Sequence, residues 1–337
     1  MKVCRTAVLD PDQVAAVLQP RDGVIAESAV GEGEFCLLEG PVRSYHRGID
    51  VEPAGSLLRV TQTVEFEVGI PYFSALFALP LRWALGPVMP PAMAPWWAPP
   101  QRLPRRAAEV LATLCALSVV IGYAGSLLTI TMTYAAAEFG ADRAAQGVAF
   151  GVVRTNVALA LLVLVAADRQ GRRRLILACA AGAAGLTTLG AIAPSLPWLV
   201  ATQIPAVALT AALLILVGVM AAEEMPAGSR AWALAVMTMT VGLGGGLATA
   251  VLPLAGVTTG GWRLTFAGAV VFLPLVASAR GHLPESRRWD AAKRAATDPA
   301  PATDAPDPAP ATHPAPATDR QAPSTTRRRL DPQAPST

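Results

Sequence analysis

Long stretches without charged residues constrain this sequence of 337 residues more than any other feature. The 174 residues from Ala107 to Arg280 contain only 15 charged side chains. Over the whole chain 15% of the residues are charged, whereas soluble domains average about 25%. So few charges cannot cover a water-facing surface. The composition therefore excludes a single soluble enzyme, a collagen-like fibre and a disulfide-stapled secreted domain.

The apolar stretches have the length of membrane helices. A helix needs about 20 mostly apolar residues to cross the hydrocarbon core of a bilayer. Dividing the stretches by this length predicts six spans, at about 110–134, 146–167, 175–193, 196–222, 231–254 and 262–279. The second span contains Arg154. A helix that started after this residue would be too short, so we place the arginine inside the outer half of the span.

Basic residues near the ends of the spans predict the orientation, because cytoplasmic loops are enriched in Lys and Arg. One side of the membrane would hold 13 of these residues, whereas the other side would hold only Arg143 and Arg263. The 13 are Arg102, Arg105, Arg106, Arg169, Arg172, Arg173, Arg174, Arg230, Arg280, Arg287, Arg288, Lys293 and Arg294. We therefore expect a multi-pass protein of the plasma membrane with both termini in the cytoplasm.

The two ends of the chain are more polar than its middle. Apolar and polar residues alternate over Leu58–Val68, which is typical of a strand with one buried face. Phe35–Leu38 and Val42–Val51 are expected to be neighbouring strands, and Pro71–Leu85 an apolar helix. The predicted domains are a small α+β cytoplasmic segment over 1–85, a Pro- and Trp-rich linker over 86–106, a six-helix membrane domain over 107–289 and a disordered Pro/Ala/Thr-rich tail over 290–337.

The order of strands and helix in residues 1–85 resembles the closing part of the polyketide-cyclase or lipid-transfer-like helix-grip fold. This resemblance implies a domain that binds apolar ligands. A β-rich cytoplasmic cap that lies on the membrane explains the same pattern.

The loop between the second and third predicted spans carries the sequence DRQGRRR, which begins at Asp168. It resembles the D-R-x-G-R-R loop that members of the major facilitator superfamily have at the same place. The resemblance implies that Asp168 latches the cytoplasmic side shut and that Gly171 permits a tight turn. It also implies that Arg169, Arg172 and Arg173 are the charge partners of the latch. The alternative is a basic turn that only orients the helices.

A second group of residues follows the order found in sugar-porter-like and metabolite-symporter-like members of that family. Glu224 and Arg230 flank a cytoplasmic loop, where they are expected to extend the charge network of Asp168. Glycines at four nearby positions would thin one helix so that a neighbour can approach closely. These positions are Gly242, Gly244, Gly245 and Gly246. The stretch LPESRRW, which begins at Leu283, is similar to the L-P-E-S-P-R-W of the family.

Three polar residues inside the spans are candidates for lining a substrate cavity: Arg154, Asn156 and Gln203. A charge within a span usually faces a cavity or a partner, so Arg154 is expected to contact an anionic group or to take part in gating. The alternative is that it snorkels to the outer interface. Asn156 and Gln203 would line the same cavity or hydrogen-bond to neighbouring helices. The predicted spans contain no acidic residue, which argues against proton coupling through an embedded carboxylate.

The resemblance implies the fold of the N-terminal six-helix half of a major facilitator transporter, because family members have twelve spans in two such halves. It implies an all-α membrane domain that moves a small solute by gradient-driven secondary transport and alternating access. Three hypotheses stay open. The chain is a truncated transporter, a half-size transporter that forms a homodimer, or a membrane-anchored lipid- or apolar-ligand-binding module without transport activity of its own.

Patterns typical of enzymes are missing from the sequence. The three histidines are far apart, and no phosphate-binding glycine loop, Ser/His/Asp arrangement or metal-ligand spacing occurs. The net charge of +3 is small and scattered, which argues against nucleic acid as a partner. We expect no cofactor and no metal, and we expect a small-molecule solute and the lipid bilayer as partners.

Overall fold

The computed structural model describes residues 1–89, 95–154 and 157–285, and their side chains except those of residues 154, 157 and 166–170. The expected disordered tail over 290–337 lies outside the described residues, as does the end of the LPESRRW stretch. Residues 1–285 belong to one compact unit of the chain.

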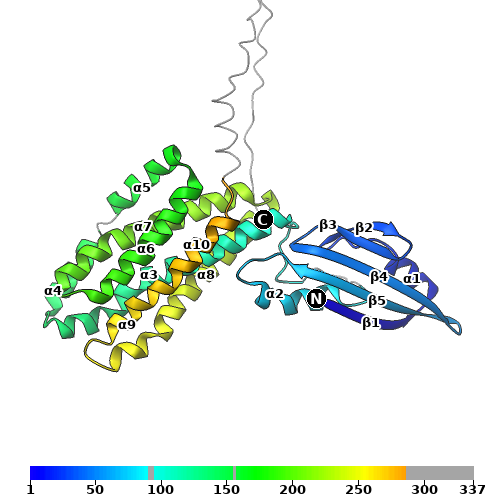
Figure 1. The fold of residues 1–337 in the computed structure, drawn as a ribbon, viewed down its shortest axis with the longest axis horizontal. Helices are drawn as coiled ribbons and strands as arrows, with labels where there is room; N and C mark the ends of the chain where they lie inside the picture. Colours follow the sequence, from blue (N-terminus) through cyan, green and yellow to red (C-terminus); the bar gives the residue numbers. More distant parts are fainter. Residues whose placement is uncertain (90–94, 155–156, 286–337) are drawn as a thin grey trace, which may run out of the picture. The chain divides into compact units, whose positions relative to one another are not determined.

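The N-terminal segment is a five-stranded antiparallel sheet with two helices (Figure 1). Its elements are β1 (Lys2–Leu9), α1 (Pro11–Val17), β2 (Ala26–Gly31), β3 (Glu34–Glu39), β4 (Val42–Ala54), β5 (Leu57–Val68) and α2 (Ser74–Leu85). The strand order is β1-β5-β4-β3-β2. The alternation expected in β5 places Val60, Val64 and Phe66 in the core. The predicted α+β segment is confirmed.

A buried ion pair joins β2 to β4 in this sheet. The side chains of Glu27 and Arg47 are fully buried, and Arg47 Nη2 lies 2.5 Å from Glu27 Oε2. Tyr45 donates a hydrogen bond of 2.6 Å to Glu27 Oε1, and Arg47 donates one of 3.0 Å to the carbonyl oxygen of Val17. Burial and the hydrogen bond to Glu27 raise the pKa of Tyr45. The pair is tolerated inside the sheet because hydrogen bonds from several elements satisfy it.

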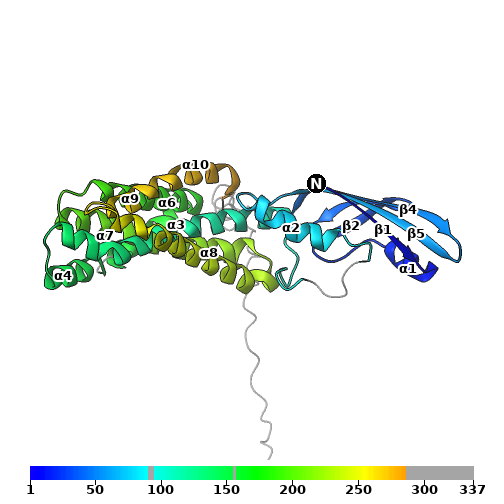
Figure 2. The same ribbon diagram turned by 90° about the horizontal axis from the view of Figure 1, so that it is seen from below.

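Six helical segments of the described chain are long and apolar enough to cross a membrane, which confirms the predicted number of spans (Figure 2). The elements of the first four spans are α3 (Arg105–Glu138), α4 (Arg143–Arg154), α5 (Val157–Gln170), α6 (Arg172–Leu189), the turn η1 (Gly190–Ile192) and α7 (Leu196–Glu224). Those of the last two are η2 (Ala227–Ser229), α8 (Arg230–Ala250), η3 (Leu252–Gly256), α9 (Trp262–Ala267), η4 (Gly268–Val271) and α10 (Phe272–His282).

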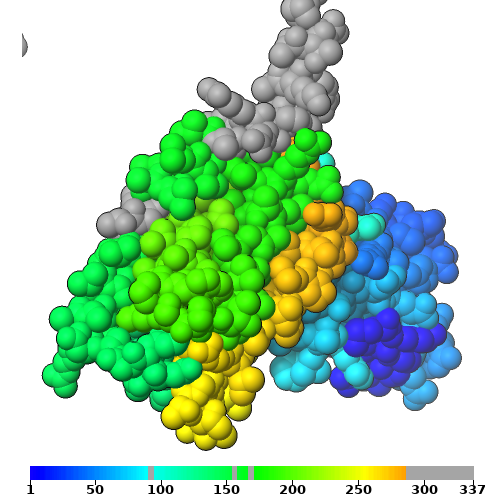
Figure 3. Space-filling view, turned by 60° about the vertical axis from the view of Figure 1, so that its left-hand side comes forward, coloured from blue at the N-terminus to red at the C-terminus, as the bar shows by residue number. Residues whose placement is uncertain are grey.

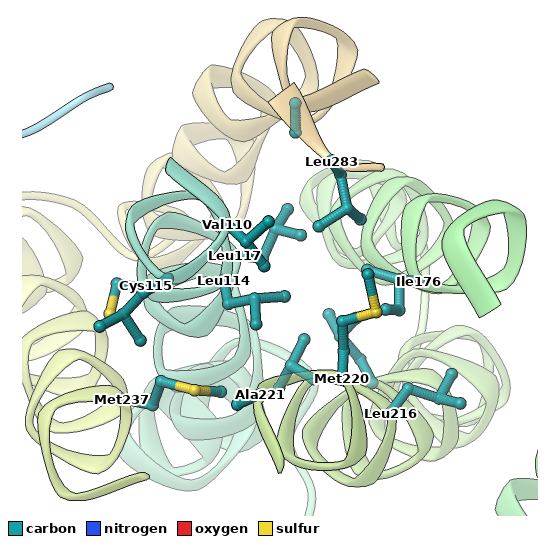
Figure 4. Close-up of a cluster of buried hydrophobic side chains, with 14 of the residues drawn as sticks. Val110, Leu114, Cys115, Leu117, Ile176, Leu216, Met220, Ala221, Met237 and Leu283 are labelled. Carbon is teal, nitrogen blue, oxygen red and sulfur yellow. The ribbon is translucent and has the colours of Figure 1, made fainter. Parts of the chain in front are cut away.

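Helix α3 is the central helix of the membrane domain. In the most apolar part of α3, 83% of the residues are buried. In the corresponding part of the segment that contains α8, only 17% are buried. In Figure 4, Leu114 of α3 points toward Met220 of α7, whereas Cys115 lies on the side of α3 that faces Met237 of α8. One helix therefore contributes to the core in opposite directions.

Helices α3 and α8 touch backbone to backbone at two glycines. A Cβ on Gly244 would lie 2.1 Å from the carbonyl oxygen of Val119, and a Cβ on Gly122 would lie 1.9 Å from that of Val241. Neither distance admits a side chain. In a bilayer, helices gain no hydrophobic stabilisation from associating, since lipid tails are as apolar as their side chains. Their association depends on close packing instead, which small residues such as glycine permit.

The four glycines expected to thin α8 differ in their surroundings. Gly244 makes the close contact, and a Cβ on Gly245 would lie 3.1 Å from the Ser126 hydroxyl oxygen. A Cβ on Gly242 or Gly246 would meet no described atom within 4 Å. The reason is the helical period, because residues two positions apart point in nearly opposite directions.

The last span packs along α6 and α3. In Figure 3 the orange surface of α10 adjoins the green surface of the middle helices, and contacts link α10 with both α6 and α3. Tyr123 of α3 donates a hydrogen bond of 2.7 Å to the carbonyl oxygen of Thr265, and its ring centroid lies 5.0 Å from that of Phe272. These contacts close the bundle around α3.

The substitution Gly244→Ala is expected to lower the stability of the bundle by about 1–3 kcal/mol, because its methyl group would overlap the backbone of Val119. The measurement is the midpoint of thermal unfolding in detergent, followed by circular dichroism. Gly246→Ala is the matched control on the same helix, and a gain of up to about 1 kcal/mol is expected there because Ala favours helices over Gly. Equal midpoints for the two variants would contradict the close approach of α3 and α8.

The substitution Glu27→Ala is expected to destabilise the sheet by about 3–5 kcal/mol, because it leaves Arg47 buried without its carboxylate. Hydrogen exchange of peptides from β2 and β4 in the full chain measures the effect. Glu65→Gln is the control, since it removes the exposed pair with Lys2 at 2.8 Å and should change exchange little. If the peptides of β2 and β4 exchange as slowly in Glu27→Ala as in the control, the buried pair does not stabilise the sheet.

Candidate functional site

The turn before α6 requires a glycine. Gly171 has φ = +90°, a conformation that L side chains rarely adopt, and its backbone is buried. A Cβ at this position would also lie 3.4 Å from both carboxylate oxygens of Glu285. The turn therefore brings the start of α6 against Glu285, which follows shortly after the end of α10.

Glu285 caps the N-terminus of α6. Its Oε1 accepts a hydrogen bond of 3.0 Å from the backbone N–H of Arg173, and Arg173 Nη2 donates one of 2.5 Å to the carbonyl oxygen of Arg280. A carboxylate at this position satisfies an otherwise unpaired N–H and interacts favourably with the positive end of the helix dipole. These contacts join the third span to the sixth.

Two ion pairs connect the same end of the bundle to α7. Arg172 pairs with Glu223, and Arg106 Nε lies 3.3 Å from Glu224 Oε2. The Glu224 side chain is fully buried, whereas that of Arg106 is 45% exposed. Together with Glu285, these residues form a charged network, which we call the basic-end network, on α3, α6, α7 and the residues after α10.

The contacts of the remaining predicted gate residues are described only in part. Arg230 donates from Nε to the carbonyl oxygen of Met225 at 3.4 Å, which closes the turn before α8. The side chains of Asp168 and Arg169 are not among those that the structure describes, so their expected latch contacts stay a prediction. Gly171, Arg172, Arg173 and Glu224 do come together at one end of the bundle.

The predicted cavity residues are only partly described. The side chain of Arg154 lies outside the described residues, and so does the whole of Asn156. Gln203 is fully buried, and its Nε2 lies 3.4 Å from the carbonyl oxygen of Leu186 on α6. Among the described residues, no hydrogen-bond partner reaches Gln203 Oε1. In this conformation Gln203 bridges α7 and α6 rather than facing an open cavity.

A second polar cluster, which we call the Glu138 clasp, lies at the other end of α3. Trp262 Nε1 donates to Glu138 Oε2 at 2.5 Å, and Arg263 Nη2 lies 2.7 Å from Glu138 Oε1. Arg263 also donates to the carbonyl oxygens of Ala191 and Ala193, at 3.1 and 2.7 Å, and its guanidinium lies 4.8 Å from the centre of the Trp262 ring. The clasp joins the first, third and sixth spans.

Sequence reasoning missed most partners of these networks. It singled out Arg172 and Glu224 as gate residues but did not identify Glu223 or Glu138, and it used Arg106 only to predict the orientation. The available signal was the position of these residues. Glu138, Glu223 and Glu224 lie at the ends of apolar helices, where a charged residue is expected to pair with an opposite charge. The pairing itself joins residues more than 100 positions apart in the case of Arg106 and Glu224.

Comparison with known proteins places this arrangement in a family. The family model "Major Facilitator Superfamily" matches residues 113–327, which is more than half of the chain. The chain belongs to the Major Facilitator Superfamily. This is a family of membrane transporters rather than of enzymes, and the match begins within α3.

Solved transporters of the superfamily match the chain at low identity. The proton:xylose symporter XylE bound to 6-bromo-6-deoxy-D-glucose is 18% identical, with a TM-score of 0.46, and the match covers 56% of this chain and 47% of that one. The inward open xylose transporter XylE from E. coli is 19% identical, with a TM-score of 0.47 and coverage of 56% and 50%. The chain spans about half the length of these transporters.

Two further comparisons add no relationship. The protein TTHA0849 from Thermus thermophilus is 18% identical, with a TM-score of 0.18, and the match covers 25% of this chain and 85% of that one. No curated protein matches the chain.

The substitution Glu138→Ala is expected to lower stability by about 1–3 kcal/mol, because it removes the acceptor of Trp262 and the counter-charge of Arg263 together. Glu138→Gln should cost less, since an amide oxygen still accepts from the indole N–H. Thermal unfolding in detergent ranks the two variants. Glu109→Gln, which breaks the partly exposed pair with Arg105 on one face of α3, is the control. A drop in the control as large as that of Glu138→Ala would contradict the clasp.

Proposed function

We propose that this member of the superfamily carries a small solute across the membrane by gradient-driven secondary transport with alternating access. We further propose that the basic-end network, extended by Asp168, Arg169 and Arg230, is its cytoplasmic gate. The observation that supports this proposal most directly is the convergence of Gly171, Glu285 and the pair of Arg172 with Glu223 at one end of the bundle.

The network suits a rigid unit that rocks as a whole. Its contacts join α3, α6, α7 and α10 at one end, and the Glu138 clasp joins three spans at the other end. Helices tied at both ends resist sliding past each other. In alternating access, one such bundle moves against a second bundle around a central site. The charges would then open and close contacts with that second bundle.

The exposed face of α8 is a surface on which a second bundle would pack. Leu234, Met239, Leu243 and Leu247 on this helix are between 40% and 74% exposed. We propose that another six-helix unit covers part of this face, and a second copy of the chain provides one such unit. Arg154 and Asn156 would contact the solute from the second span.

The distribution of arginines supports a proposal for the orientation. The start of α3, the start of α6 and the start of α8 carry Arg105, Arg172 and Arg230, all at the end of the bundle that contains the network. Because cytoplasmic loops are enriched in Lys and Arg, we propose that this end and both termini lie in the cytoplasm of a plasma-membrane protein.

Uptake into proteoliposomes tests the transport proposal. The purified chain is reconstituted and offered radiolabelled sugars, organic acids and drugs, with and without an ion gradient. We expect at least one solute class to accumulate, and Glu223→Gln and Asp168→Asn to slow its uptake roughly tenfold, which corresponds to about 1.4 kcal/mol of gate stability. Glu109→Gln, outside the network, should transport normally. If the unmutated chain moves no solute, the proposal that it transports by itself fails.

Crosslinking in native membranes tests the second bundle. A crosslinked dimer through Leu247, on the exposed face of the last turn of α8, is expected if two copies rebuild the pathway. Monomer alone, at crosslinker concentrations that capture a known membrane dimer, would exclude the homodimer and leave another six-helix unit as the partner.

A further inference from the structure

An apolar cavity of about 280 Å³ lies between α2, the residues before α3, and the first turns of α3 and α8. Phe77 of α2, Trp97, Ala112 of α3 and Trp232 of α8 contribute to its wall. Thr240 contributes the one hydroxyl group among the lining side chains of the described chain, and its hydrogen bond of 2.8 Å already goes to the carbonyl oxygen of Met237. The cavity therefore offers its occupant apolar surface.

The cavity is continuous with the surface of two membrane spans. Its lining on α8 includes Met239 and Leu243, whose side chains are 74% and 52% exposed. Its lining on α3 runs from Ala108 to Cys115, in the first three turns of that span. An occupant that enters along these helices comes from the bilayer, because exposed apolar residues of a span contact lipid tails.

Helix α2 covers the cavity from the side of the sheet. One face of α2 packs into the sheet core through Leu81, whereas Leu76, Leu79 and Trp83 on the other face are 68%, 52% and 70% exposed. The residues before α2 are held against α10, since Tyr72 Oη lies 3.0 Å from the Ser278 hydroxyl oxygen. A short helix with an apolar outer face, fixed beside the end of a span, is typical of a segment that lies in the membrane interface.

The two spans that line the cavity each begin with an exposed arginine. Arg105 is the first residue of α3 and Arg230 the first residue of α8. Arg105 pairs with Glu109 at 2.8 Å, but its side chain is 54% exposed and keeps further donors free for a second acceptor. An apolar slot between helices that begin with exposed arginines matches an amphiphile with an acyl chain and a phosphate.

We propose that the cavity holds one acyl chain of an anionic phospholipid from the leaflet on the side of α2, with its phosphate near Arg105 and Arg230. The bound lipid fills the space between the sheet segment and the first and fifth spans. It therefore acts as a structural link between the two parts of the unit. This site is separate from the proposed gate. A second bundle that packed on residues 232–243 of α8 would compete with the lipid for the same surface, whereas one that packed on the last turn of α8, at Leu247, would leave the site open.

Photocrosslinking tests the proposal on the full chain in vesicles. The probe is phosphatidylglycerol with a diazirine near the end of one acyl chain, and labelled peptides are identified by mass spectrometry. We expect labelling to concentrate in the peptides that contain residues 103–115 and 232–243. Thr240→Phe, which fills the cavity, should reduce this labelling roughly tenfold. Ala235→Phe is the matched control, because it adds the same ring on the exposed face of the same helix.

The headgroup contact has its own test. Arg105→Gln should lower the preference of the labelled site for phosphatidylglycerol over phosphatidylcholine, whereas Arg143→Gln, at the start of α4, should leave it unchanged. Equal labelling in Thr240→Phe and Ala235→Phe, or labelling spread evenly over the other spans, would overturn the proposal. Crosslinks between two copies through residues 232–243 would overturn it as well, because they would show a second copy in the place of the lipid. If Thr240→Phe fails to fold, the Arg105→Gln comparison decides.

Discussion

The close backbone contact of α3 and α8 sets the geometry of the membrane domain. Gly122 and Gly244 leave no room for a side chain at the crossing, so the two helices approach as nearly as their backbones allow. In lipid, apolar side chains gain little from leaving water for a helix interface, and tight packing must supply the association energy instead. With α8 held close on one side, α3 can be enclosed by α6, α7 and α10 on the others, which explains its high burial.

Charged residues complete this apolar bundle at its two ends. Inside the bilayer a charge is costly, whereas at a helix end it can meet a partner and water together. The described charges of α3 follow this rule, since Arg106 pairs with Glu224 near its start and Glu138 with Arg263 at its end. Each pair joins helices that are distant in the sequence. The bundle is thus tied at both ends and packed in the middle, which agrees with the proposed movement as one unit against a second bundle.

Several features of this arrangement were predictable from the sequence. The six spans follow from apolar runs of membrane length, and the strand β5 follows from strict alternation over Leu58–Val68. The strands β1 and β2 were not predicted, because their exposed residues break the alternation, as the burial of Lys2–Leu9 shows. Gly171 was predictable as a turn residue. The capping of α6 by Glu285 was not predictable, since this contact joins residues more than 100 positions apart.

The sequence by itself determined that this protein is an α-helical membrane protein with a small α+β segment, and its motifs indicated the Major Facilitator Superfamily. Span length, alternation and motif spacing are local properties, so they can be read along the chain. Only the tertiary structure decided which charges pair, which of the four glycines of α8 touch a neighbour, and that Gln203 bridges two helices. These outcomes depend on the rotation of each helix about its own axis and on which helices become neighbours. Both are set when the whole bundle packs.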